Sequence, residues 1–129
     1  MPVRSLSTSV LRWPDAAAVD RAVRQWVPKV LAQKPEVIRI GYFGSYARGD
    51  WGVGSDLDLV VVVDHAEKRF ERRAVDWDAT ELPVPADVLI YTAQEWGDLA
   101  VRRGFGETVR REAVWVYEAP PPATLPPDR

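Results

Sequence analysis

The sequence has no cysteine, a single histidine and no long apolar run. Without cysteine, disulfides and thiolate metal sites are excluded, and a reducing cytoplasm is the expected compartment. The longest strictly aliphatic run, residues 59–63, is far too short to cross a bilayer, and residues 1–6 contain no apolar signal-peptide core. A formal net charge of −2 gives no basic footprint for nucleic acid. We therefore expect a cytoplasmic protein that binds neither a membrane nor nucleic acid directly.

The size and composition are those of one globular domain. Of the 129 residues, 47% are hydrophobic and 28% are charged, as in an ordinary chain with a single core. We expect this domain to span residues 1–118. Residues 119–129 contain five prolines and no expected core residue, so we expect an extended or disordered tail there.

Apolar spacing predicts helices and strands in alternation. Trp13-Pro14-Asp15 signals a helix start, and the helical spacing that follows meets Pro28, which we expect to kink or end the helix near Val27. Strand-like runs cover residues 37–43, 86–91 and 114–117 and the apolar run 59–63, whose strand we expect to include Asp56 and Asp58, and helical spacing covers residues 66–75, 92–100 and 107–112. This order predicts an α/β (α+β) domain with a mixed sheet flanked by helices.

The segment 66–75 combines an apolar and a basic side. We expect Phe70 and Ala74 to face the core and His65, just before the segment, to lie on the surface. The basic residues assigned to the solvated side are Lys68, Arg69, Arg72 and Arg73. A docking patch for an acidic partner or RNA is the alternative for this side.

A turn with free backbone donors follows the first expected strand. Gly44-Ser45 breaks this strand, and residues 45–48 begin a short helix. A strand–Gly–Ser–helix turn offers backbone N–H groups to phosphate oxygens, and glycine leaves room for a phosphate close to the backbone. Tyr46 and Trp51 lie beside this turn, where they either stack on a base or pack in the core.

Two aspartates come next. Asp56 and Asp58 are two residues apart, so their carboxylates point to the same face of a strand. Like charges this close raise one pKa or require a cation between them. Mg²⁺ prefers a few carboxylates together with substrate phosphates. The turn and the aspartate pair therefore predict a site for a metal-bound nucleoside triphosphate.

Both halves of this stretch resemble a known signature. The chain reads GSYARG at residues 44–49 and SDLDL at residues 55–59, which resembles the GSxARG…SDxDL signature of the nucleotidyltransferase superfamily. The compact size is similar to that of its minimal nucleotidyltransferase (MNT) branch. The resemblance covers about residues 14–118, and it implies the nucleotidyltransferase fold.

The resemblance also implies roles for single residues. Asp56 and Asp58 would bind Mg²⁺, and Asp87, at the start of an apolar strand, matches the family's third carboxylate. With two ions bound, Asp87 would share the second Mg²⁺ and act as general base for an attacking hydroxyl. The residues expected to bind the nucleotide are Gly44, Ser45, Arg48 and Ser55. Arg48 would pair either with a phosphate or with an aspartate of the site.

The sequence shows no segment for an acceptor, so we expect another molecule to supply the hydroxyl. For MNT domains the resemblance implies a partner of the HEPN type, a helical RNase toxin. The leading interpretation is an antitoxin that forms a hetero-oligomer with this toxin and transfers AMP from ATP to one of its tyrosine hydroxyls. Two alternatives stay open: a small-molecule acceptor presented by a partner subunit, and a non-catalytic module that masks its partner.

Overall fold

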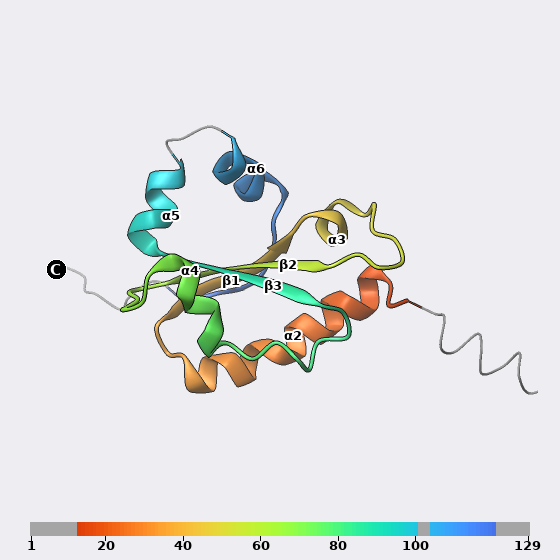
Figure 1. Ribbon diagram of the computed structural model, residues 1–129, viewed down its shortest axis with the longest axis horizontal. Coiled ribbons are helices and arrows are strands. Elements are labelled where there is room, and N and C mark those ends of the chain that lie inside the picture. The colour runs from red at the N-terminus through yellow and green to blue at the C-terminus, as the bar shows by residue number, and fades with distance from the viewer. Residues whose placement is uncertain (1–12, 101–103, 121–129) are drawn as a thin grey trace, which may run out of the picture.

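The computed structural model describes residues 13–100 and 104–120. The described strands form a mixed sheet in the order β3-β2-β1-β4. They are β1 (Val37–Phe43), β2 (Leu57–Val63), β3 (Ala86–Thr92) and β4 (Val114–Glu118). β1 runs antiparallel to β2 and β4, whereas β2 and β3 are parallel. The expected mixed sheet with flanking helices is confirmed (Figure 1).

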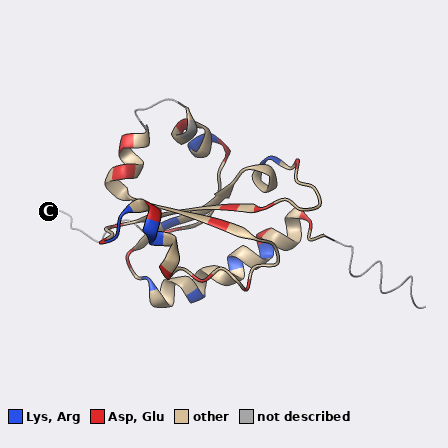
Figure 2. Cartoon of the chain, in the orientation of Figure 1, with Lys and Arg blue, Asp and Glu red and all other residues tan. Residues whose placement is uncertain are grey.

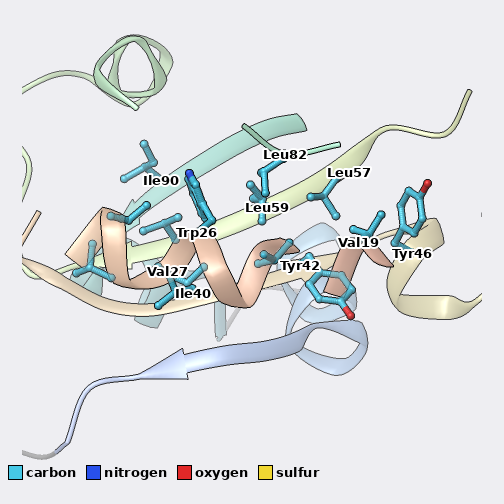
Figure 3. Packing of buried hydrophobic residues seen from close by; sticks show 14 of the residues in the cluster. Val19, Trp26, Val27, Ile40, Tyr42, Tyr46, Leu57, Leu59, Leu82 and Ile90 are labelled. Carbon is cyan, nitrogen blue, oxygen red and sulfur yellow. The ribbon is translucent and has the colours of Figure 1, made fainter. Parts of the chain in front are cut away.

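Helix α2 (Ala16–Gln33) covers one face of the sheet (Figure 1). It begins as expected, because the carboxylate of Asp15 accepts a hydrogen bond from the Ala18 N–H at 2.9 Å. Its buried side packs on residues from β1 and β2 in the larger of two core clusters (Figure 3). The buried residues of α2 are Val19, Val23, Trp26, Val27 and Val30.

Of the two expectations for Pro28, a kink or the end of this helix, the second is wrong. The helix continues to Gln33, and Pro28 lies on its exposed side. Proline removes one backbone hydrogen bond from a helix interior. Here Val27 and Val30 are buried on either side of that position, so packing against the sheet holds the turn in place.

Helices α5 (Ala93–Ala100) and α6 (Phe105–Glu112) lie over the opposite face (Figure 1). A reciprocal cap opens α5 as expected: the Thr92 N–H donates to Glu95 at 2.8 Å, and the Glu95 N–H donates to the Thr92 hydroxyl at 3.1 Å. Trp96 and Val109 from these helices join the second core cluster. Other members of that cluster are Phe43, Val60 and Val62.

The segment 66–75 departs from its expected pattern. Only α4 (Phe70–Arg73) is α-helical, and a 3-10 turn, η1 (Ala74–Asp76), follows it. Phe70 and Ala74, expected to face inward, are exposed, whereas Arg73, expected in solvent, is buried. Helical spacing failed here because the α-helix lasts four residues. His65 is exposed, as expected.

The short connecting helix α3 (Ser45–Arg48) follows β1 directly, as expected. Across the described residues, no helix is long and apolar enough to cross a membrane. The expected Pro-rich tail lies outside the described residues beyond position 120.

Candidate active site

The sheet register places two of the predicted carboxylates next to each other. Asp58 of β2 pairs with Asp87 of β3, and on its other side Asp58 pairs with Phe43 of β1. Asp58 shares a face with Val60, on the side covered by α5 and α6. Acidic segments therefore lie side by side where β2 and β3 begin (Figure 2).

The remaining predicted carboxylate, that of Asp56, is exposed, and Asp56 immediately precedes β2. Burial raises the pKa of Asp58, and the charges of Asp87 and Asp56 raise it further, whereas Arg48 opposes the rise. Asp56 therefore acts electrostatically on Asp58, although it lies beyond the strand. The three carboxylates predicted from the sequence belong to one electrostatic cluster.

This donor set fits a cation whose coordination a substrate completes. Two oxygen-bearing side chains on neighbouring strands, with mutual repulsion and little charge of opposite sign, are stabilised when a divalent cation binds between them. Among residues 13–100 and 104–120, however, no three acidic, histidine or cysteine side chains form a ready-made metal cage. Mg²⁺ typically retains waters and binds substrate phosphates beside one or two carboxylates, so an open arrangement suits this ion.

Gly44 is required beside Asp58 for two structural reasons. Its backbone has φ 82° and ψ −153°, which side chains with a Cβ rarely adopt. A Cβ at this position would also collide with the carboxylate of Asp58. From the sequence, we expected the missing side chain of Gly44 to leave room for a phosphate. In the structure, the carboxylate of Asp58 lies where a Cβ of residue 44 would be.

Arg48 extends from α3 toward two acidic side chains. Its Nε donates to Asp50 at 3.0 Å, and its Nη1 donates to Glu112 at 3.4 Å. Glu112 also accepts a hydrogen bond from the Gly44 N–H at 3.4 Å. The predicted arginine thus lies beside the carboxylates, and Glu112 is a residue of the site that sequence reasoning missed.

A cleft of about 420 Å³ separates α3 from α6. It is lined by Phe43, Gly44, Ser45, Arg48, Asp56, Asp58, Thr108, Val109 and Glu112. Ser45 therefore faces the same space as Asp56 and Asp58. Ser55 does not line it: its hydroxyl accepts a hydrogen bond from the Gly52 N–H at 2.8 Å and holds the glycine-rich loop.

Tyr46 and Trp51 pack together in the protein. Their rings stack at 5.6 Å between centroids, and Tyr46 is 3% exposed. The Tyr46 hydroxyl donates to the Pro14 carbonyl at 3.1 Å and accepts from the Trp13 indole at 2.9 Å. Of the two alternatives for Tyr46, core packing is the one observed.

A larger, open cleft of about 1090 Å³ follows the free edge of β3. Asp58 and Asp87 lie on its wall, together with residues of the loop 77–86 such as Trp77 and Pro83. The carboxylates therefore stand between two spaces, the smaller cleft near α3 and the larger one near β3.

The sequence matches the family model of the nucleotidyltransferase domain over residues 24–111. The chain therefore belongs to the nucleotidyltransferase domain family, and the resemblance drawn from GSYARG and SDLDL is confirmed. The match contains every residue of the candidate site except Glu112, which immediately follows its last residue.

Solved structures share the fold at low identity. A structure from Sulfolobus solfataricus assigned as a nucleotidyltransferase is 20% identical, covers 80% of this chain and 83% of its own, and has a TM-score of 0.56. Two mutant structures of the MntA-HpeT toxin-antitoxin have TM-scores of 0.51 and 0.50 at 16% and 19% identity. They cover 74% of this chain and 73% and 72% of their own chains. No protein with a curated description matches the sequence.

Proposed function

We propose that the protein is a Mg²⁺-dependent nucleotidyltransferase that moves AMP from ATP to a tyrosine hydroxyl of a HEPN-type RNase toxin and thereby acts as its antitoxin. The observation that carries the nucleotidyl-transfer part is the pairing of Asp58 and Asp87 on neighbouring strands beside the cleft at Gly44 and Arg48. The choice of partner is supported by the similar fold of the MntA-HpeT toxin-antitoxin structures.

In this proposal Asp56 and Asp58 hold a nucleotide-associated Mg²⁺, and Asp87 joins them for a second ion. Bound Mg²⁺ would supply positive charge to the phosphate oxygens during an in-line displacement. Asp58 must be ionised to bind a cation, and its raised pKa shows that its charge is poorly compensated by the protein alone. The acidic pair is therefore suited to metal binding rather than to a structural ion pair.

The two clefts suggest separate sides for the two substrates. Ser45, Arg48 and the Gly44 N–H face the smaller cleft, where they would contact the triphosphate. Asp87 is exposed on the larger cleft along β3, where an acceptor hydroxyl can reach its carboxylate. Ser55 would act on the nucleotide through the glycine-rich loop that it holds.

The reaction is then a single displacement at the α-phosphorus. The tyrosine oxygen forms a bond to the α-phosphorus while the bond from this phosphorus to the α–β bridging oxygen breaks, and pyrophosphate leaves. The proton of the tyrosine hydroxyl passes to the carboxylate of Asp87. The product is a tyrosine that carries AMP in phosphodiester linkage.

The test is the intact mass of the partner encoded beside this protein after incubation with the protein, ATP and Mg²⁺. We expect increments of one AMP that disappear in the Asp56→Ala, Asp58→Ala double variant. Asp64→Asn is the matched control, because Asp64 is an exposed acid at the opposite end of β2. A partner that is silenced in a stable complex without any mass increment would refute the transfer and identify a masking module.

A further inference from the structure

Glu112 occupies an unexpected position in the nucleotide cleft. Its carboxylate accepts hydrogen bonds from the Gly44 N–H and from Nη1 of Arg48, both at 3.4 Å. These two donors are the groups that the proposed function assigns to phosphate oxygens. The side chain of Glu112 is 21% exposed, so it is not a freely solvated surface acid.

The sheet fixes this position. β4 pairs antiparallel with β1, with Tyr42 opposite Val114 and Gly41 opposite Trp115. This pairing ends at Tyr42 and Val114, so the end of α6, two residues before Val114, lies close to the turn at Gly44, two residues after Tyr42. A side chain at position 112 therefore lies beside the Gly44 turn.

The charge of Glu112 is poorly placed for stability. Glu112 is the last residue of α6, where the helix dipole disfavours a negative charge. The same cleft also contains Asp56 and Asp58, which repel another carboxylate. The compensating contacts, at 3.4 Å, are longer than typical N–H···O hydrogen bonds, so they are weak and a stronger anion can displace them.

We infer that Glu112 is an internal competitor for the triphosphate position: its carboxylate holds the Gly44 N–H and Arg48 in the free protein and gives them up when a nucleotide binds. The inference rests on the proposed function, because it takes the cleft to be the nucleotide site. Glu112 thereby keeps Arg48 directed at the cleft and weakens nucleotide binding, which favours release after each transfer.

The test measures binding by calorimetry, using Mg²⁺ and an ATP analogue with a methylene group between the α- and β-phosphorus atoms. We expect Glu112→Gln to bind this analogue about fivefold more tightly than the unchanged protein, an effect of the size of a partly exposed ion pair. Glu107→Gln is the matched control, because Glu107 lies on the same helix, is exposed and pairs only with Arg111 among the described residues. This control should bind like the unchanged protein.

Thermal unfolding provides a second readout that does not depend on turnover. Without nucleotide, Glu112→Gln should unfold within a few degrees of the unchanged protein. With the analogue and Mg²⁺, its melting temperature should rise further than that of the unchanged protein, because tighter binding stabilises the folded state more. If Glu112 had only a structural role, Glu112→Gln would lower the melting temperature without nucleotide and would leave the increase caused by the analogue and Mg²⁺ unchanged.

The outcomes separate the two ideas. If the unchanged protein binds the analogue and Glu112→Gln binds it equally or more weakly, the inference is overturned and the proposed function stands. If neither protein binds the analogue, the proposed function itself fails, and the inference fails with it. Binding by Glu112→Gln that is tighter, or that is detected only in this variant, supports the inference.

Discussion

The two ends of strands β2 and β3 differ in how far their charged side chains are paired with opposite charges. At the start of these strands, Asp58 and Asp87 are neighbours of like charge, and the pKa of Asp58 is raised by burial and by its acidic neighbours. At the far end, the guanidinium of Arg73 meets the Glu95 carboxylate in two hydrogen bonds of 2.6 and 3.1 Å. Arg73 also donates to the carbonyls of Lys68 and Ile90, at 2.8 and 3.0 Å.

Structural charge and candidate functional charge differ in whether the protein itself compensates them. The buried arginine has a partner for each of its nitrogens, as a stable buried ion requires. The carboxylate pair, in contrast, keeps a repulsion that folding alone does not relieve. A charge cluster that remains uncompensated is the one that suits an external cation and substrate.

The largest expected effect on stability comes from the compensated end. Replacing Arg73 with alanine removes a donor from the Ile90 carbonyl and leaves the Glu95 carboxylate with only the Thr92 N–H among the described residues, and we expect a loss of about 2 kcal/mol in the free energy of unfolding. The estimate is below that for a fully buried ion pair because the Glu95 side chain is 41% exposed. Urea unfolding measures the loss.

Arg72→Ala is the control, because Arg72 is an exposed neighbour on the same short helix. It should change the free energy of unfolding by less than about 0.5 kcal/mol. Equal losses for both variants would show that Arg73 contributes no more than a surface residue and would remove the contrast between the two ends.

At the uncompensated end we expect a substitution to raise the stability of the fold, by less than the loss expected for Arg73→Ala. Asp58→Asn removes the repelled charge, so the metal-free variant should melt a few degrees higher at neutral pH while losing the proposed AMP transfer. Because the folded-state pKa of Asp58 is raised, its ionisation destabilises the fold above that pKa. The advantage of asparagine should therefore shrink as the pH falls through the raised pKa, where Asp58 itself becomes protonated.

Melting temperatures measured across this pH range, without Mg²⁺, test the prediction. Asp64→Asn again serves as the control, since the side chain of Asp64 is exposed and its carboxylate forms an ion pair with the exposed His65. A stabilisation that does not depend on pH would mean that the charge of Asp58 is not its source.

Much of the fold and most of the proposed site follow from local sequence rules. Capping chemistry predicts the starts of α2 and α5. Strand alternation predicts that Asp56 and Asp58 share a strand face, but only Asp58 lies in β2, because the strand begins at Leu57. Asp87 was placed by the family resemblance and by the conflict between its charge and an apolar strand. These features depend on neighbouring residues, which the sequence displays directly.

Three of the misses depend on contacts between distant segments. Pro28 does not end α2 because packing against the sheet outweighs a local rule. Arg73 is buried because Glu95 and the Ile90 carbonyl lie where its guanidinium ends. Glu112 contacts Gly44 because the pairing of β1 with β4 brings the end of α6 close to the Gly44 turn, which no spacing within the sequence reveals.

The smallest expected effect concerns the charges that remain exposed near Arg73. Arg69 and Arg72 are exposed residues that follow the end of β2. The strand from Asp58 to its last residue is about 16 Å long, which is roughly two screening lengths at physiological salt. Reversing both charges, with Arg69→Glu and Arg72→Glu, should therefore leave the proposed AMP transfer to the proposed partner within about threefold of that by the unchanged protein. A masking module that used this basic surface would instead lose its partner. Intact mass and complex formation, measured on the same samples, distinguish catalysis from masking. Transfer that persists while the complex weakens agrees with catalysis at the Asp58–Asp87 end. If silencing of the partner falls in proportion to binding, and no AMP is found on the partner at any stage, catalysis is contradicted.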